Sequence, residues 1–313
     1  MKAIILKDFG GVEQLVQEEI PVPTLHDNEV LVKVKAFSIN PVDIKTRNGK
    51  GAAARIKDQT PMILGWDISG VITEMGANVS DFKAGDEVFG MVNFPGHGKA
   101  YAEYVAVPAS QLALKPENIS HEEAAAATLA ALTAWLAVVH SAKVQAGQKV
   151  LIHAASGGVG HFAVQIAHYL GAYVIGTSSA ANRDFVLSLG ADQHIDYKAQ
   201  SLEKEVSEID FVLDALGGET IDQSLKVIKP GGTIISMPSG ANDLVTQKAE
   251  AKGVHGYPIM VHSSGKDMKD IADLLEKGIL KAHVSKIVTF DQIAQAHHQV
   301  ESGKTVGKVV VTV

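Results

Sequence analysis

The sequence predicts an α/β protein of two domains, one rich in β-strands and one built on a doubly wound parallel sheet. The chain has 313 residues, which is enough for about two domains. Residues 149–171 have the pattern of a strand, a tight glycine turn and a helix. Near residue 119 the predicted pattern of secondary structure changes, from short strands with alternating residues to strands that alternate with helices.

Composition excludes several classes of protein. A hydrophobic content of 46% and a charged content of 20% are typical of a globular domain with a sizeable core. The net charge of −7 disfavours a nucleic-acid or anionic-membrane surface, which needs clustered Lys and Arg. The chain has no cysteine, so disulfides, thiol nucleophiles and Cys-ligated zinc are ruled out. No apolar run approaches the ~18 residues of a membrane helix, and the start of the chain has strand character, so we expect a cytoplasmic location.

The first 118 residues predict a β-rich domain. Short alternating runs punctuated by Gly, Pro and Asn predict strands at 2–6, 29–39, 70–75, 87–91 and 101–107. Residues 47–60 show no period and predict a mobile loop, of a length that is often functional.

The middle of the chain predicts a parallel sheet with right-handed crossovers. Ser120 and Glu123 form a capping-box pattern that opens a helix reaching to about Leu132. Strands and helices then alternate to about residue 262. An amphipathic helix at 266–277 and a strand at 308–313 follow, and we place this tail back in the β-rich domain. The predicted domains are therefore 1–120 with 263–313, and 121–262.

The glycine turn predicts a site for a dinucleotide. Its pattern is Ala155-x-Gly157-x-x-Gly160, with Ser156, Gly158 and Val159 between, so alanine replaces the first glycine of the usual fingerprint. Glycines let backbone N–H groups approach a pyrophosphate, and the helix N-terminus adds a partial positive charge. A glycine turn before a helix can also serve packing alone.

The end of the next strand indicates which dinucleotide binds. NAD enzymes place an acidic residue there for the ribose 2′-OH, whereas this strand continues through Ser178 to Arg183 without one. Hydroxyls and a cation suit a 2′-phosphate, which favours NADP(H). The alternative is that Ser178 and Ser179 cap the next helix and Arg183 is a solvated helix residue.

Several further motifs occur in a fixed order with this turn. They are Asn40-Pro-Val-Asp-Ile-Lys45, Ile63-Leu-Gly-Trp-Asp-Ile-Ser-Gly70, Ala84-Gly-Asp-Glu-Val88, Ala102-Glu-Tyr104 and Thr133-Ala134. Jointly they resemble the medium-chain dehydrogenase/reductase family, in its zinc-free quinone oxidoreductase (zeta-crystallin-like) branch, over essentially the whole chain. The resemblance implies a GroES-like domain and a Rossmann domain, with cofactor and substrate in the cleft between them. It also implies a homodimer paired through Rossmann sheet edges, for which the apolar strand near Tyr257–Val261 could serve.

The same resemblance raises the question of zinc. Zinc-containing relatives use Cys, His and sometimes Glu, where this chain has Asn40 and Trp66-Asp67. With no cysteine, neither a catalytic nor a structural zinc site can be built, so we expect no metal. Reduction of a quinone or an α,β-unsaturated carbonyl then fits better than alcohol chemistry, because such a substrate delocalises its own charge.

The resemblance also implies roles for cofactor-binding residues. Thr133 lies where the family contacts the nicotinamide end, although a helix N-cap is an equal alternative. Leu216 and Ser236 begin loops after two strands, which the family uses for the ribose and carboxamide. Ser178, Arg183 and Tyr197 match the 2′-phosphate end. Asp214 is expected to anchor a loop through hydrogen bonds.

Three residues near the end of the strand at 29–39 are candidates for the chemistry. Asn40 could contact the developing oxyanion, or could be only a turn residue before Pro41. Asp43 could orient the neighbouring loop. Lys45, which enone-reducing relatives share, could stabilise an enolate or donate a proton, and the alternative is a surface lysine.

Two functions follow. The first is an NADPH-dependent reductase of quinones or α,β-unsaturated carbonyls, acting on a small molecule without a nucleic-acid or membrane partner. The second is an NADPH-binding protein with little turnover, in a structural or RNA-binding role like some zeta-crystallin-like relatives. The net acidity weighs against RNA, and steady-state oxidation of NADPH separates the two.

Overall fold

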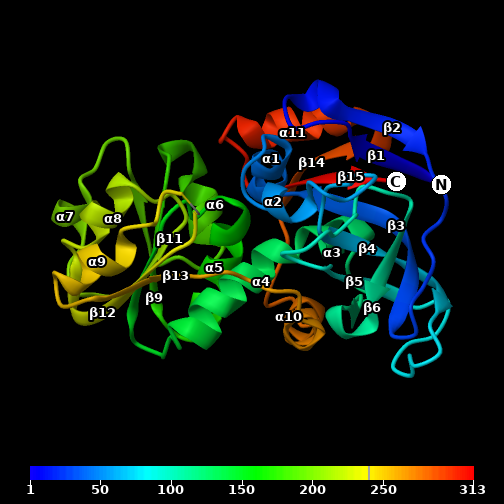
Figure 1. Cartoon of the computed structure of the whole chain (residues 1–313). Helices are drawn as coiled ribbons and strands as arrows, with labels where there is room; N and C mark the ends of the chain where they lie inside the picture. The colour runs from blue at the N-terminus through cyan, green and yellow to red at the C-terminus, as the bar shows by residue number, and fades with distance from the viewer. Residues whose placement is uncertain (239) are drawn as a thin grey trace. The chain divides into compact units, whose positions relative to one another are not determined.

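The computed structural model describes residues 1–238 and 240–313, and its chain divides into two units. The β-rich unit comprises Met1–Leu132 and Val261–Val313, and the parallel-sheet unit comprises Thr133–Met260 (Figure 1). The α/β fold with these two kinds of domain confirms the predicted fold class. The division lies later than the predicted boundary at 120, because helix α3 (His121–Ala126) packs on the strands of the β-rich unit.

The β-rich unit is built on a mixed sheet in the order β14-β15-β3-β4-β5-β7, with β6 also paired to β3. Its strands are β3 (Glu29–Ile39), β4 (Asp67–Met75), β5 (Glu87–Met91), β6 (Tyr104–Pro108), β7 (Ala113–Leu114), β14 (Val284–Thr289) and β15 (Lys308–Thr312). Strands β1 (Lys2–Leu6) and β2 (Leu15–Glu19) form a separate antiparallel pair. Strand β3 is central and mostly buried, because its apolar side chains supply both faces of the sheet.

The C-terminal tail returns to this sheet, as predicted. Strand β15 pairs antiparallel with β3 and parallel with β14. Three of its valines, Val309, Val310 and Val311, have no exposed surface. The β-rich unit is therefore assembled from two segments that are remote in the sequence.

Short helices cover the β-rich unit. They are α1 (Pro41–Arg47), α2 (Ala53–Ile56), α3, α10 (Gly265–Glu276) and α11 (Ile293–Glu301), with 3-10 turns η1 (Val12–Gln14), η2 (Ala109–Gln111) and η5 (Phe290–Gln292). The prediction of a mobile loop over 47–60 is wrong for part of that segment. Residues Ala52, Ala53 and Ile56 are buried, so helix α2 is anchored by apolar packing. The capping box of α3 is confirmed, since Glu123 N donates to Ser120 Oγ and Ser120 N donates to Glu123.

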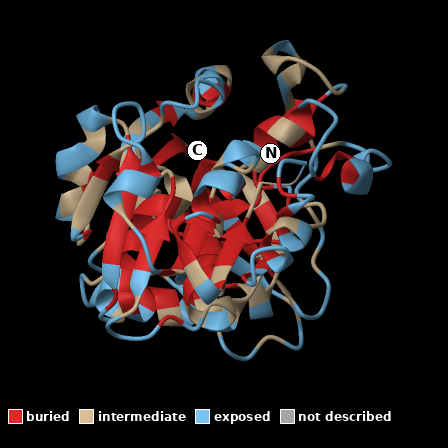
Figure 2. Cartoon of the chain, turned by 90° about the vertical axis from the view of Figure 1, so that its left-hand side faces the viewer, coloured by how far each residue is buried: buried red, intermediate tan, exposed pale blue. Residues whose placement is uncertain are grey.

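The parallel-sheet unit has the strand order β10-β9-β8-β11-β12-β13, with every pair parallel. Its strands are β8 (Lys149–Ile152), β9 (Tyr173–Ser178), β10 (Gln193–Asp196), β11 (Ile209–Asp214), β12 (Ile228–Ser236) and β13 (His255–Pro258). The strands are largely buried, while the loops between them are exposed (Figure 2). The carboxyl ends of these parallel strands share one edge of the sheet.

Helices lie on both faces of this sheet. They are α5 (Gly158–Tyr169), α6 (Arg183–Ser188), α7 (Leu202–Glu205), α8 (Glu219–Ser224) and α9 (Val245–Glu250), preceded by the 3-10 turn η4 (Ala180–Asn182) at α6. Helices α5 and α6 pack on β8, β9 and β10, whereas α8 and α9 pack on β11, β12 and β13. Strand order runs outwards in both directions from β8, so right-handed crossovers put the two groups on opposite faces (Figure 1). Helix α4 (Leu129–Trp135) and the π-helical segment η3 (Leu136–Ser141) join the units along the chain.

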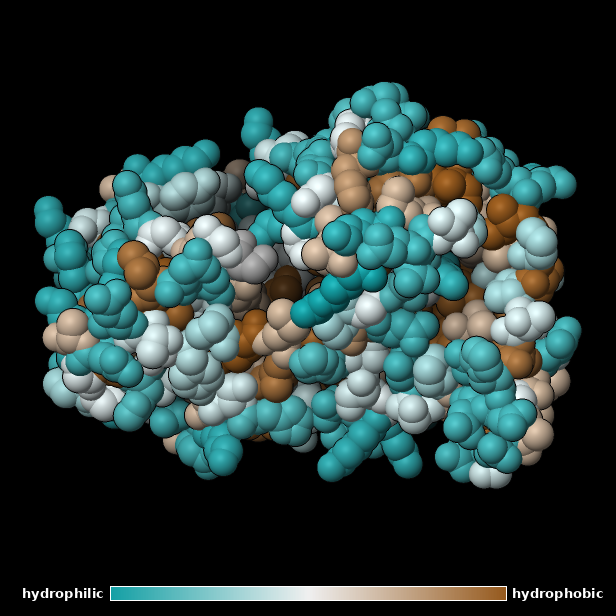
Figure 3. Space-filling model, in the orientation of Figure 1, coloured by the Kyte–Doolittle hydropathy of each residue, from teal (hydrophilic) through white to brown (hydrophobic). Residues whose placement is uncertain are grey.

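The surface is mainly hydrophilic on the face drawn in Figure 3, with hydrophobic residues scattered among polar ones. Within residues 1–238 and 240–313, every helix is too short or too polar to cross a membrane.

Candidate active site

Helix α1 begins directly after the central strand β3 and carries all three candidate catalytic residues. Asn40 is its N-cap and Pro41 its first residue, a position where the missing N–H of proline costs nothing. The backbone N–H of Asn40 donates to Asp43 Oδ2 at 2.6 Å, which closes a capping box. The Asn-Pro pair therefore starts a helix here, where sequence reasoning offered only a turn.

A buried lysine from the C-terminal strand meets the start of this helix. Lys308 is only 3% exposed, and its Nζ donates to Asn40 Oδ1 and, at 3.1 Å, to the carbonyl of Ile39. Nζ also lies 3.6 Å from Asp67 Oδ2. The ammonium is thus surrounded by oxygen atoms from β3, α1 and β4.

Asp67 completes this cluster and is fully buried. Its Oδ2 accepts from Ser38 Oγ at 2.5 Å and from Asn40 Nδ2 at 2.6 Å. Its Oδ1 accepts from the backbone N–H of Leu129 at 3.0 Å. Both ends of the Asn40 amide are therefore engaged inside the protein, which leaves one amide hydrogen for any other partner.

Burial shifts the titration of the charged groups in this cluster. Burial raises the pKa of Asp43 to about 8, and the charge of Asp67 adds to this shift, while the Asn40 N–H, Lys308 and Tyr101 oppose it. Burial lowers the pKa of Lys308, and the two carboxyls act in the opposite direction. The Asp43 carboxyl is therefore largely neutral at pH 7.

A second chain of buried polar groups holds the other end of α1. Arg47 is 2% exposed; its Nη1 donates to His297 Nδ1 at 3.1 Å and its Nη2 pairs with Glu301. His297 Nε2 lies 3.1 Å from the Tyr101 hydroxyl. Burial, followed by the charge of Arg47, lowers the pKa of His297 to about 3, so the ring is neutral. Because Arg47 can only donate, the ring hydrogen is on Nε2 and points to Tyr101.

Lys45 lies on the same short helix, between the buried residues Ile44 and Thr46, and is itself half-buried. Its backbone carbonyl accepts from Lys50 N at 2.8 Å, at the turn that leads to α2. The helix that carries Lys45 is therefore fixed at one end by Lys308 and Asp67, and at the other by Arg47. The catalytic roles of Asn40, Asp43 and Lys45 stay predictions.

In the parallel-sheet unit, the glycine turn has the geometry of a close backbone approach. A Cβ on Gly160 would lie 2.2 Å from the Ala154 carbonyl oxygen and 2.8 Å from Ala155 Cα, so only glycine fits there. Ala155 is fully buried, and its N–H donates to the Thr177 carbonyl at 2.9 Å. Ala154 has φ of 51°, a left-handed conformation that is rare for alanine and common at ligand-binding turns. Helix α5 begins at Gly158 without a side-chain cap, so its first N–H groups are available to an anion.

Two of the predicted 2′-phosphate residues, Ser178 and Tyr197, meet at the ends of β9 and β10. The Tyr197 N–H donates to the Ser178 carbonyl at 3.3 Å, and Arg183 begins α6. Of the alternative, side-chain capping is not seen: Ser178 Oγ contacts the Ser179 carbonyl and His194, and Ser179 occupies the N-cap position without a side-chain bond. Its other part is confirmed, since Arg183 is a helix residue with a side chain that is 63% exposed. Asn182 Nδ2 donates to Ser156 Oγ at 3.1 Å and so connects this region to the glycine turn.

Asp214 connects the two remaining loops and anchors them, as predicted. Its carboxylate accepts from the backbone N–H groups of Leu216 and Gly217 and from Thr220 Oγ1. Its Oδ2 accepts from Ser236 Oγ at 2.6 Å. Leu216 is 51% exposed, whereas Ser236 is fully buried with its hydroxyl already engaged.

Thr133 and His153 are two further buried polar residues. Thr133 lies inside α4 and is 8% exposed, so the helix N-cap alternative is wrong for it. His153 is a satisfied core histidine, bonded to Thr177 Oγ1 at 3.0 Å and to Ser224 Oγ at 2.9 Å. The cofactor contacts predicted for Thr133, Leu216 and Ser236 remain predictions.

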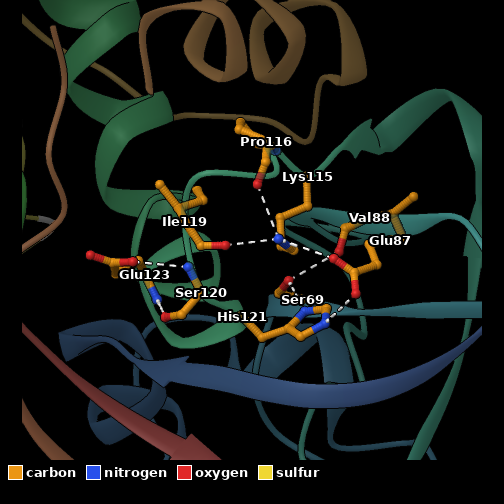
Figure 4. Close-up of polar contacts among 9 residues, drawn as sticks. All are labelled: Ser69, Glu87, Val88, Lys115, Pro116, Ile119, Ser120, His121 and Glu123. Carbon is orange, nitrogen blue, oxygen red and sulfur yellow. Dashed lines mark hydrogen bonds and ion pairs between the residues drawn. The ribbon is translucent and has the colours of Figure 1, made fainter. Parts of the chain in front are cut away.

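A third polar cluster, in the β-rich unit, has a Ser–His–Glu arrangement (Figure 4). His121 Nδ1 lies 2.8 Å from Ser69 Oγ, and Nε2 lies 3.5 Å from Glu87 Oε1. Ser69 is fully buried and its hydroxyl approaches the Val88 carbonyl at 3.1 Å, so no substrate can reach it. Lys115 joins Glu87 to the carbonyls of Pro116 and Ile119. The cluster ties β4 and β5 to the start of α3 and is structural.

Comparison with known proteins identifies the family of this chain. Residues 26–117 match the model of the alcohol dehydrogenase GroES-like domain, and residues 189–311 match that of a zinc-binding dehydrogenase. An NADPH-dependent alkenal/one oxidoreductase of Arabidopsis thaliana is 37% identical over 99% of this chain and 79% of the relative. The chain belongs to the medium-chain dehydrogenase/reductase family. Within that family it falls in the quinone oxidoreductase branch, and it is an oxidoreductase.

Solved structures of the family agree with the fold. The quinone oxidoreductase of Coxiella burnetii has a TM-score of 0.95 and 36% identity, covering 100% of this chain and 99% of that one. The quinone oxidoreductase of Escherichia coli complexed with NADPH has a TM-score of 0.89 and 27% identity, with 100% of both chains covered. The fold of the β-rich unit is thus GroES-like, and that of the parallel-sheet unit is of the Rossmann type.

The donor set of the β-rich unit does not fit zinc. Zinc in this family needs sulfur, imidazole or carboxylate ligands that are not already committed. Here Asn40 Oδ1 and Asp67 Oδ2 face the Lys308 ammonium, and Trp66 is a buried core side chain whose indole N–H donates to the Gly96 carbonyl. Among residues 1–238 and 240–313, no group of three or more His, Cys, Asp or Glu side chains is placed to hold a metal ion.

Most residues missed by sequence reasoning lie in these buried networks. Arg47 and His297 are 250 positions apart, and Tyr101 and His297 are 196 apart. No local pattern connects such residues. His194 had a weak signal, since it alternates with Asp196 on a strand that ends beside Ser178.

Proposed function

We propose that this enzyme is an NADPH-dependent reductase of quinones or α,β-unsaturated carbonyls that works without zinc. The observation that carries the proposal is the Lys308 side chain, whose Nζ donates to Asn40 Oδ1 and pairs with Asp67, at the positions where the zinc-containing relatives hold their metal. A reductase that lacks a Lewis acid needs a substrate that delocalises the incoming charge, and quinones and enones do so.

Three further observations support NADPH as the hydride source. The turn at 154–160 leaves backbone N–H groups of α5 available to a pyrophosphate. No acidic residue stands between the end of β9 and Arg183 to bind a ribose 2′-OH. A relative with 37% identity is described as NADPH-dependent, and the solved structure of a relative with 27% identity is complexed with NADPH.

The side chains on α1 would manage charge and protons. The reduced nicotinamide, when bound, would supply a hydride to the electrophilic carbon or to the quinone. Lys45 would stabilise the resulting enolate or hydroquinone oxyanion and donate the proton that completes the reduction. Asn40 and Asp43 would hold the helix in register, through the bonds to Lys308, Asp67 and the Asn40 N–H.

The test is steady-state oxidation of NADPH and NADH with 1,4-benzoquinone, 9,10-phenanthrenequinone and a short enone. We expect turnover with at least one substrate and a higher kcat/KM with NADPH than with NADH. Tight NADPH binding without turnover on any of these would instead indicate the binding-protein function. A kcat/KM ratio in favour of NADH would overturn the cofactor assignment.

Lys45 gives the sharpest prediction about catalysis. Replacement Lys45→Met should lower kcat by about 100-fold or more, the usual worth of a positioned proton donor, with little change in the Kd for NADPH. The exposed Lys50→Met, five residues further along, is the matched control and should retain activity. Unchanged turnover in Lys45→Met would remove this lysine from the mechanism.

The oligomeric state and the compartment are separate parts of the proposal. We propose a homodimer, for which the edge position of β13 in the parallel sheet offers unpaired backbone groups. Light scattering on the purified chain would test it. A cytoplasmic location stays a prediction from sequence, and fractionation of cells that produce the protein would test that.

A further inference from the structure

His194 places a titratable ring directly against a predicted 2′-phosphate residue. Its Nε2 lies 2.8 Å from Ser178 Oγ, across the parallel pair formed by β9 and β10. Ser178 itself is only 4% exposed, whereas the imidazole is partly exposed. An anion that approaches this end of the sheet therefore finds the ring more accessible than the hydroxyl behind it.

Charged groups of both signs lie on the elements that carry the ring and its predicted phosphate partners. Arg183, at the start of α6, has a side chain that is 63% exposed, and its guanidinium lies 3.9 Å from the almost fully exposed Asp184. Tyr197 is 62% exposed, and Lys198 Nζ lies 5.8 Å from the centre of its ring. Asp196, two residues after His194 on β10, is the nearby acidic group on the same strand. Of these groups, Asp196 and Arg183 act electrostatically on the His194 ring, in opposite directions.

The hydrogen bond between Ser178 and His194 depends on the protonation of the ring. Ser178 has one hydroxyl hydrogen, and its Oγ also lies 3.1 Å from the Ser179 carbonyl. If Nε2 carries no hydrogen, the hydroxyl must donate to it. If Nε2 is protonated, the ring donates to Ser178, and the hydroxyl hydrogen turns to another acceptor. A second proton on the ring then adds a full positive charge at the same place.

We propose that His194 is a specificity-determining residue of the NADP(H) site, whose protonated form attracts the 2′-phosphate and so makes the preference for NADPH over NADH depend on pH. This inference rests on the proposed cofactor. It assigns to Ser178 the role of orienting the imidazole, and places the direct attraction for the phosphate on His194 and Arg183.

In the free chain the surroundings disfavour the charged form of the His194 ring. Burial lowers the pKa of His194; Asp196 opposes that shift, and Arg183 adds to it. A bound phosphate dianion would favour the charged ring and raise the pKa again. Binding of the phosphate would then be accompanied by uptake of a proton, and affinity would rise as the pH falls towards 6.

The test is calorimetric titration of the full-length protein with 2′,5′-ADP and with 5′-AMP between pH 6 and 8.5. For each pH the ratio of the two dissociation constants isolates the 2′-phosphate. We expect this ratio to favour 2′,5′-ADP, and to rise about fivefold from pH 8.5 to pH 6, as for an added, partly exposed ion pair. Titrations in two buffers that differ in ionisation enthalpy should show proton uptake with 2′,5′-ADP only.

The matched variant is His194→Gln, whose amide can still donate to Ser178 but does not titrate. It should bind 2′,5′-ADP at every pH, with only the residual slope caused by the second ionisation of the phosphate near pH 6. Far-UV circular dichroism confirms that the variant is folded. The same pH slope in His194→Gln as in the natural chain would overturn this inference and leave NADPH as the cofactor. An equal affinity for 2′,5′-ADP and 5′-AMP at all pH values would overturn both.

Discussion

At the scale of single residues, the most unusual feature is a positive charge sealed inside the β-rich unit. Lys308 and Asp67 are both essentially without exposed surface, and each of them bonds to Asn40. Removing one member of such a pair leaves an uncompensated buried charge, which commonly costs about 3–5 kcal/mol. The pair therefore fixes the geometry at the start of α1 while leaving little freedom for substitution.

Asp43 gives a prediction about pH. Its pKa is raised by burial to about 8, whereas the same carboxyl in the unfolded chain ionises near its ordinary value of 3.8. The folded state therefore holds a proton that the unfolded state has lost. Stability from this group is present below pH 4 and is lost as the pH rises through 8.

Asp43→Asn removes that proton linkage and keeps the shape of the side chain. Relative to the natural chain, the urea midpoint of the variant should increase steadily as the pH rises from 5 to 8. Asp81→Asn, at an exposed turn, is the control for loss of one charge. A midpoint difference that stays flat over this range would mean that Asp43 is already ionised in the folded protein.

At this scale, prediction from sequence succeeded for residues whose contacts are with residues close to them in the sequence. Asp214 anchors the loop that follows it, and Gly157 and Gly160 lie in the turn where their spacing put them. It failed for Arg47, Tyr101 and His297, because their partners come from distant segments. A buried polar network is defined by the fold, and its members carry no periodic signal.

At the scale of elements, the glycine turn and helix α5 depend on one close contact. Replacing glycine by alanine inside a helix usually stabilises it by about 0.5–1 kcal/mol. At Gly160 the sign should reverse, because the added Cβ would lie 2.2 Å from the backbone oxygen of Ala154.

Gly160→Ala should therefore destabilise the protein by about 1–3 kcal/mol, the usual range for overpacking, and should weaken binding of NADPH. Urea unfolding measures the first effect and fluorescence titration the second. Tyr169→Ala, at a position of the same helix that is 50% exposed, is the control. A Gly160→Ala protein as stable as the natural one would show that the turn can move.

Elements with strong periodicity or clear caps were predicted well, and short ones were not. Strand β3 and the capping box of α3 are as expected. Helices α1 and α2 were missed, since seven and four residues are too few to show a helical period. They are stabilised by tertiary contacts, such as the burial of Ile56, which a local reading does not see.

At the scale of the whole molecule, the chain's two tryptophans fall one in each unit. Trp66 is 1% exposed in the β-rich unit, and Trp135 belongs to the parallel-sheet unit. In a Trp135→Phe background the fluorescence of Trp66 reports the β-rich unit alone, and the reverse substitution reports the other. Each unit can thus be followed separately in the intact protein.

A chain that ends at Gly307 should lose the fold of the β-rich unit. The deletion removes strand β15 from between β14 and β3 and takes Lys308 away from Asp67. Trp66 emission should shift to the red, while Trp135 emission changes less. Removal of Val313 alone is the control, since that residue is 38% exposed. A Trp66 spectrum unchanged by the longer deletion would contradict the structural role of β15.

The predicted domain organisation depends on two long features of the sequence, the change in strand and helix pattern near residue 119 and the strand-like tail. The boundary itself differs by about a dozen residues, since the capping box marks where a helix begins but not which sheet it packs on. Helix α3 lies against β3, β4 and β15. Only the packing assigns it to the β-rich unit.

The insertion of β15 beside β3 has a consequence for synthesis on the ribosome. Ile39 and Lys308, which bond to each other, are 269 positions apart, so translation at the usual rates separates them by about 10–50 s. During that time the parallel-sheet unit, which is continuous in sequence, can fold on its own. Strand β3 meanwhile keeps an open apolar edge, and Asp67 has no ammonium beside it. The nascent β-rich unit is therefore prone to aggregation during that period. Strand β15 then covers the open edge of β3 and also brings Lys308 to Asp67.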